Sequence, residues 1–111
     1  MNTKILDSIR VEQMINDKGN LASNQFIIKM DGGIAFQSYD SLIVTVDEDN
    51  RVITIYPDWY HSVTTRKYRN MFFRNYAHFR DHAHFRSLST KKGIEEALQK
   101  GEINGWKIKM K

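Results

Sequence analysis

Four short β-rich segments between residues 24 and 56 constrain the fold more than any other feature of the chain. NQFIIKM and IAFQSY flank Asp31-Gly32-Gly33, and SLIVTV and RVITIY flank the acidic stretch DEDN. Glycine supplies the positive φ that a tight hairpin turn needs, and β-branched residues favour strands. The pattern predicts four antiparallel strands. Their expected core residues are Ile43, Val46, Ile53 and Ile55.

The C-terminal third predicts a short helix and a final strand. SLSTKKGIEEALQKG offers Ser89 or Thr90 as N-cap and Gly101 just past the last turn. NGWKIKMK alternates apolar residues with lysines, which is typical of a strand with one buried face.

The N-terminal stretch TKILDSIRVEQMINDKGN gives a weaker pattern. Ile5, Leu6 and Ile9 share one side of a helical wheel, whereas Val11 and Met14 do not. We therefore expect a short helix that ends near Asp17-Lys18-Gly19-Asn20.

The aromatic and basic stretch PDWYHSVTTRKYRNMFFRNY predicts a long amphipathic helix from about Thr64 to Ala83. On a helical wheel the rings of this helix fall in one stripe and most of its cations point away from it. The rings are expected in the core and the cations in water. The stripe contains Tyr68, Phe72, Tyr76 and Phe79. Trp59 and Tyr60 precede the helix, where they either close the end of the core or stand exposed as a binding hot spot.

Positive charge is concentrated in the same part of the chain. Residues 57–92 carry eight Lys/Arg against two Asp/Glu, although the whole chain has a net charge of only +4. Such asymmetry favours an anionic partner, either nucleic acid or an acidic protein surface, although a solvated helix face explains part of it. The candidate partner-binding residues are Arg66, Lys67, Arg69, Arg74, Arg80, Arg86, Lys91, Lys92, Trp59 and Tyr60.

No catalytic, cofactor or metal site is predicted. His78 and His82 have the i, i+4 spacing of a helical metal pair with Asp81 nearby, but no third histidine is aligned with them. Structural histidines are the favoured interpretation. His61 and Ser62 are neighbours in sequence without an orienting acid, so they do not indicate a nucleophile pair.

Taken together, the 111 residues predict one α+β domain. We expect a mainly antiparallel sheet of about five strands, packed by one long amphipathic helix and a short second helix. The chain has no cysteine, no apolar run of membrane-spanning length and no signal-peptide pattern, so we expect a cytoplasmic protein.

One part of the chain resembles a segment shared by small phage and plasmid proteins of Gram-positive bacteria. In that segment S-Y-x-x-x-I is followed by a turn and then by W-D-Y-S-x-T-T-x-K-Y-x-x-x-F, and this chain departs from it at Tyr60-His61. The matching residues are Ser38, Tyr39, Ile43, Trp59, Ser62, Thr64, Thr65, Lys67, Tyr68 and Phe72.

The resemblance implies a non-enzymatic protein of a mobile element that evades host defence. A compact chain without an evident active site is similar in character to the type II-A anti-CRISPR proteins, which inhibit Cas9. Many Cas9 inhibitors are acidic DNA mimics, whereas this chain is basic. The resemblance therefore implies interference with guide-RNA loading through RNA phosphates or acidic patches of Cas9. The alternative is a small basic regulator that binds nucleic acid directly.

Overall fold

The computed structural model describes residues 9–77 and 85–111. Its elements in chain order are β1 (Arg10–Ile15), β2 (Leu21–Met30), β3 (Gly33–Ser38), β4 (Ser41–Asp47), β5 (Val52–Ile55), the 3-10 helix η1 (Pro57–Tyr60), α2 (Val63–Met71), the π-helical turn η2 (Phe72–Tyr76), the 3-10 helix η3 (Arg86–Ser89), α3 (Lys91–Lys100), β6 (Glu102–Ile103) and β7 (Trp106–Met110).

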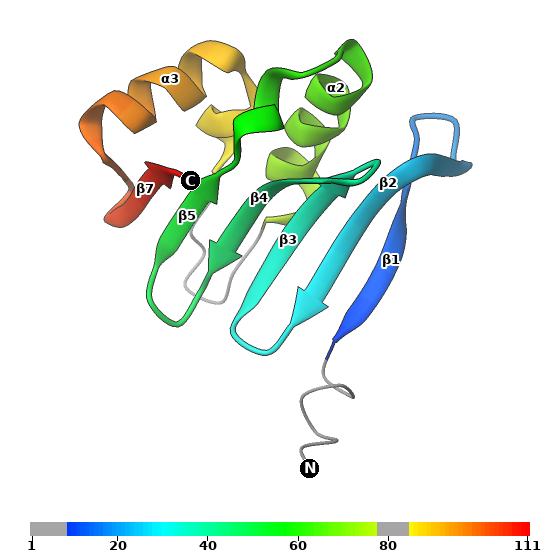
Figure 1. Ribbon diagram of the computed structural model, residues 1–111, viewed down its shortest axis with the longest axis horizontal. Coiled ribbons are helices and arrows are strands. Elements are labelled where there is room, and N and C mark those ends of the chain that lie inside the picture. The colour runs from blue at the N-terminus through cyan, green and yellow to red at the C-terminus, as the bar shows by residue number, and fades with distance from the viewer. Residues whose placement is uncertain (1–8, 78–84) are drawn as a thin grey trace.

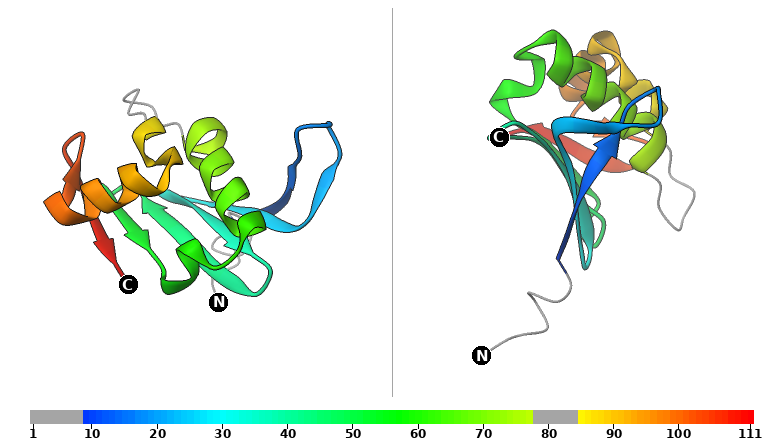
Figure 2. Two further views of the ribbon diagram at one scale, coloured as in Figure 1. Left: turned by 90° about the horizontal axis from the view of Figure 1, so that it is seen from above. Right: turned by 90° about the vertical axis from the view of Figure 1, so that its right-hand side faces the viewer.

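One curved sheet forms the base of the molecule. Its strand order is β1-β2-β3-β4-β5-β7-β6, and every neighbouring pair is antiparallel except β5 and β7, which are parallel. In the described part of the chain α2 and α3 lie on the same face of this sheet (Figures 1 and 2). The core is therefore the single layer between the helices and the sheet.

The four-strand meander predicted for residues 24–56 is confirmed as β2 to β5. The β2–β3 turn depends on glycine, because Gly32 has φ +79° and a Cβ on Gly33 would lie 2.6 Å from the Val46 carbonyl oxygen. The four residues expected in this core, Ile43, Val46, Ile53 and Ile55, are all buried.

The predicted sheet of about five mainly antiparallel strands is wrong, because the structure has a mixed sheet of seven. The parallel β5–β7 pair needs a crossover connection, which α2 and α3 supply. The sequence indicated the last strand but not its partner. Asn104 and Gly105, both with positive φ, form the turn between β6 and β7, and this Asn-Gly hairpin signal was missed.

The prediction of a short N-terminal helix is also wrong over the described residues. Arg10–Ile15 is an edge strand that pairs with β2. Val11 and Met14 break the helical pattern because they point to opposite sides of a strand, with Met14 fully buried and Val11 62% exposed. Residues 1–8 lie outside the described residues.

The helix predicted from about Thr64 to Ala83 is longer than the one observed. Nine residues of α2 are followed by five residues of π-helix, and Ala77, at φ −88° and ψ 65°, is no longer helical. Tyr68 and Phe72 are buried as predicted and Tyr76 is half-buried, whereas Phe79 and the rest of the expected helix to Ala83 lie outside the described residues. Phe73, which the wheel did not place in the stripe, is fully buried beside Phe72.

The C-terminal elements follow the sequence closely. Thr90 caps α3 by accepting a hydrogen bond from the Gly93 amide, and Gly101 ends it at φ +74°. Trp106 and Ile108 of β7 are buried, with Trp106 against Phe85 at a ring distance of 5.1 Å.

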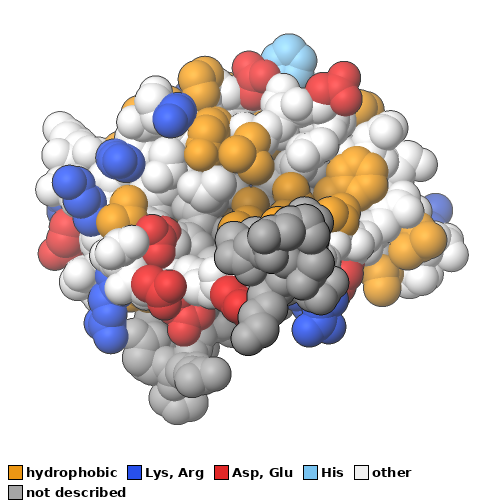
Figure 3. All heavy atoms as spheres, turned by 60° about the horizontal axis from the view of Figure 1, so that its bottom comes forward, with side chains coloured by type: hydrophobic (Ala, Val, Ile, Leu, Met, Phe, Trp, Pro, Cys, Tyr) orange, Lys and Arg blue, Asp and Glu red, His pale blue; other side chains and the backbone are white. Residues whose placement is uncertain are grey.

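The sheet face that α2 and α3 leave uncovered is apolar at the β1–β3 end and polar at the β5–β7 end. Val11 of β1, Ile28 of β2 and Ala35 of β3 are neighbours across the apolar end. Thr54 of β5 and Lys109 of β7 are neighbours across the polar end. Figure 3 shows hydrophobic side chains on this side of the molecule, with acidic residues near its lower edge.

Candidate functional site

The connection from β5 to α2 places two aromatic side chains just before the helix. Pro57 starts η1, which ends at Tyr60, and Ser62 then caps α2 by accepting a hydrogen bond from the Thr65 amide at 3.1 Å. This compact turn directs Trp59 and Tyr60 toward α2. Arg66 is the fourth residue of that helix and Arg69 lies in its last turn.

The outer ring, Tyr60, is 40% exposed and has a cation on each of two neighbouring elements. The Arg66 guanidinium carbon lies 4.3 Å from the ring centroid and the Lys91 ammonium nitrogen lies 4.7 Å from it. Arg66 belongs to α2 and Lys91 is the first residue of α3. We call Tyr60, Arg66 and Lys91 the Tyr60 cluster.

The inner ring, Trp59, pairs with a different arginine. Trp59 is partly buried against the core, and the Arg69 guanidinium carbon lies 5.3 Å from its ring centroid. Arg69 is only 1% exposed and donates hydrogen bonds to the Trp59 carbonyl at 2.9 Å and to the Asn70 side-chain oxygen at 2.7 and 3.1 Å. Burial, followed by the charge of Arg66, lowers the pKa of Arg69 to about 10. Arg69 was a predicted contact residue, but its burial makes it part of the Trp59 packing.

The other predicted cations are spread over the helical layer. Lys67 lies 3.8 Å from Asp17 and Lys92 lies 4.0 Å from Glu96, both as exposed ion pairs, which contribute little stability. Arg74 and Arg86 are exposed, and Arg80 lies outside the described residues. The structure thus brings Tyr60, Arg66 and Lys91 together, with the Trp59 ring 5.5 Å from that of Tyr60.

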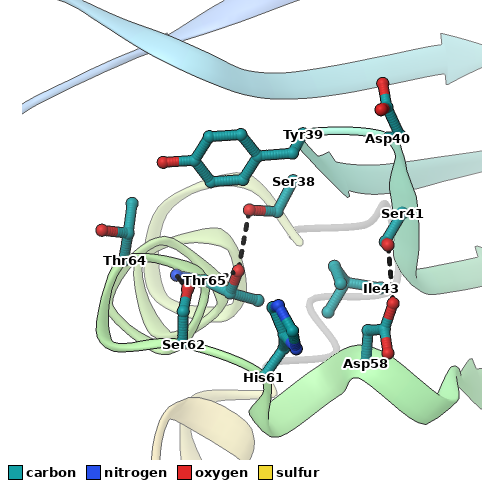
Figure 4. Close-up of a pocket in the computed structure, with 10 residues that line it drawn as sticks. All are labelled: Ser38, Tyr39, Asp40, Ser41, Ile43, Asp58, His61, Ser62, Thr64 and Thr65. Carbon is teal, nitrogen blue, oxygen red and sulfur yellow. Dashed lines mark hydrogen bonds between the residues drawn. The ribbon is translucent and has the colours of Figure 1, made fainter.

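A polar pocket, shown in Figure 4, is lined by His61 and Thr65, which are the chain neighbours of Tyr60 and Arg66 in the cluster. It has a volume of about 450 Å³ and lies between the β3–β4 turn and the start of α2. Hydrogen bonds order its walls. The Ser38 and Thr65 hydroxyl oxygens lie 2.9 Å apart, the Ser62 hydroxyl donates to the Thr65 hydroxyl at 3.1 Å, and the Ser41 hydroxyl donates to the Asp58 carboxylate at 2.6 Å. The lining residues are Ser38, Tyr39, Asp40, Ser41, Ile43, Asp58, His61, Ser62, Thr64 and Thr65.

The sequence analysis did not predict this pocket. The segment shared with small phage and plasmid proteins nevertheless contained a signal for the pocket. Ser38, Tyr39 and Ile43 belong to the first half of that segment, and Ser62, Thr64 and Thr65 belong to its second half. All six line the pocket. Their convergence depends on packing α2 against β3, which residue spacing alone does not reveal.

Within residues 9–77 and 85–111, no group of three or more His, Cys, Asp or Glu side chains could hold a metal ion. His78, Asp81 and His82, the candidate metal residues, lie outside those ranges. No helix in the described part of the chain is long and apolar enough to cross a membrane.

Comparison with known protein families matches most of the chain to a family model. A family model described as a family of unknown function (DUF8033) matches residues 9–92, which extend from β1 to the start of α3 and include the Tyr60 cluster and the pocket. Neither the curated proteins nor the solved structures gave a match.

Proposed function

We propose that this chain, which belongs to the DUF8033 family of unknown function, is a non-enzymatic protein of a phage or other mobile element that binds and inhibits a host nucleoprotein. Its place of action would be the bacterial cytoplasm. Cas9 with its guide RNA is the first target to test, because the segment resemblance suggests a host-defence inhibitor and the basic composition of residues 57–92 suits an RNA partner.

The Tyr60 cluster is the observation that carries the proposal. Arg66 and Lys91 come from different helices and meet at one exposed ring, at 4.3 and 4.7 Å. An arginine held against an aromatic face keeps its N–H edges free for phosphate, and a nearby lysine adds a second charge. A lone solvated helix face would not require cations from two elements to converge on one tyrosine.

Direct binding to free nucleic acid is the alternative function. It uses the same cluster. The eight Lys/Arg against two Asp/Glu in residues 57–92 favour direct binding as much as they favour inhibition of a nucleoprotein. A protein of this kind would need no Cas9 to form its complex.

The test is Cas9 cleavage with the protein added before or after guide loading. We expect stronger inhibition when it is added first, and we expect the double variant Arg66→Glu/Lys91→Glu to relieve inhibition. Lys109→Glu, an exposed change on β7, is the matched control. Absence of inhibition in either order would contradict the proposal for that Cas9.

A mobility-shift titration distinguishes direct nucleic acid binding from inhibition of a nucleoprotein. A direct binder should shift RNA or DNA without Cas9, and its affinity should fall with salt by a log-log slope of about −0.9 per duplex phosphate contact. A complete lack of shift at low salt would eliminate the direct-binding function.

A further inference from the structure

Two ring side chains stand on opposite walls of the pocket beside the Tyr60 cluster. Tyr39 lies on one side of it and His61 on the other, with Ile43 between them (Figure 4). Its volume of about 450 Å³ is sufficient for one nucleobase and its sugar. Aromatic and histidine side chains are the usual partners on which unpaired bases stack.

The charges of the pocket are opposite to those of the cluster. Asp40 and Asp58 line the pocket, and among the residues that the structure describes no lysine or arginine does. A phosphate would be repelled there, whereas a group rich in N–H donors would find acceptors. The Ser41 hydroxyl bonds to one oxygen of Asp58 and fixes the orientation of this carboxylate.

The chain connects the two surfaces over a short distance. Tyr60 of the cluster is followed directly by His61 of the pocket, and Thr65 of the pocket is followed directly by Arg66 of the cluster. A nucleotide can therefore place its base among the acidic and aromatic side chains while its phosphate lies beside Arg66.

Tyr39 lies in the two-residue turn between β3 and β4, next to the paired Ser38 and Ser41. Its φ is +55°, in the left-handed region that bulky residues rarely adopt, and its amide donates a hydrogen bond to the Asn24 carbonyl at 2.7 Å. The side chain is nevertheless 48% exposed. Two-residue hairpin turns place one or both of their central residues at positive φ, so the turn accounts for this conformation and leaves the Tyr39 ring at the pocket wall.

We propose that the pocket receives an unpaired base, guanine by preference, from a nucleic acid strand whose phosphates contact the Tyr60 cluster. This inference rests on the proposed function, because it requires a nucleic acid partner. Guanine presents adjacent ring and amino N–H donors along one edge, which match a carboxylate such as Asp58, and one face of the base can stack on Tyr39.

Fluorescence anisotropy with labelled RNA heptamers tests the base preference. The probes are U7 and the same heptamer with a central G or a central A. We expect the G-containing probe to bind at least about fivefold more tightly than the other two, the lower limit for one well-formed base contact. Asp58→Asn should remove this preference, whereas Asp49→Asn, in the β4–β5 turn, should retain it.

Two outcomes separate this inference from the proposed function. If all three probes bind equally and Asp58→Asn changes nothing, the base pocket is overturned and nucleic acid binding stands. If no probe binds at low salt, direct RNA contact fails and the pocket assignment fails with it. Arg66→Glu should weaken all three probes by similar factors, since phosphate contacts do not depend on the base.

Discussion

Two arginine–aromatic pairs join η1 to α2 and differ mainly in burial. Trp59 and Arg69 form the inner pair, in which the guanidinium is 1% exposed and bonded to the Trp59 carbonyl and to Asn70. Tyr60 and Arg66 form the outer pair, where the ring is 40% exposed and Lys91 adds a second cation. The same residue types thus serve packing in one pair and present charge to solvent in the other.

The difference follows from desolvation. A buried guanidinium loses its hydration and is tolerated only when its donors find fixed acceptors, which Trp59 and Asn70 supply to Arg69. Arg66 is less deeply buried and keeps donors available for a partner. The inner pair should therefore control stability and the outer pair should control binding.

Arg69→Ala should give the largest loss of stability. The change leaves the Trp59 carbonyl and the Asn70 side chain without their donor and opens a cavity, so we expect the free energy of unfolding to fall by about 2–4 kcal/mol. Urea denaturation measures the loss. Arg74→Ala, an exposed change in η2, should cost less than about 0.5 kcal/mol. Equal effects of the two substitutions would contradict a structural role for Arg69.

Asn70→Ala tests the same inner pair through its acceptor. Two Arg69 donors bond to the Asn70 side-chain oxygen, and their loss should lower the free energy of unfolding by about 1–2 kcal/mol. Exposed Asn75 on η2 provides the matched control, Asn75→Ala. A loss no greater than that of the control would mean that water replaces Asn70 at Arg69.

The outer pair should contribute little to stability. A double-mutant cycle of Tyr60→Ala and Arg66→Ala should give a coupling energy of about 0.5 kcal/mol, the value expected for a cation at an exposed ring. A coupling above about 2 kcal/mol would assign the Tyr60 cluster to the core and weaken its proposed role as a contact surface.

Elements that are determined by neighbouring residues could be predicted from the sequence, whereas elements that depend on distant contacts could not. The meander from β2 to β5 could be predicted because its turns are set by neighbouring residues such as Asp31 and Gly32. The caps of α3 at Thr90 and Gly101 are equally local. Strand β1 could not be predicted, since its residues become a strand only by pairing with β2, and tertiary pairing overrides weak helical periodicity.

The candidate site was only partly predictable for the same reason. The helical wheel identified Tyr68 and Phe72 as core, but it treated Arg69 as a surface cation because the Trp59 carbonyl that accepts its hydrogen bond lies outside the helix. Nor could the wheel reveal that Lys91 approaches Tyr60, since 31 positions separate them in the sequence. Contacts of this kind require the packed arrangement of α2 and α3.

The most direct test of the account is NMR mapping of backbone and side-chain signals of the ¹⁵N-labelled protein during titration with a short G-containing RNA. We predict that the signals of Tyr60, Arg66 and Lys91 shift with a common affinity, together with those of the adjoining pocket. Signals of Val11 and Lys109, on the opposite face of the sheet, should remain in place. Shifts confined to that face, with none in the Tyr60 cluster, would contradict the central claim.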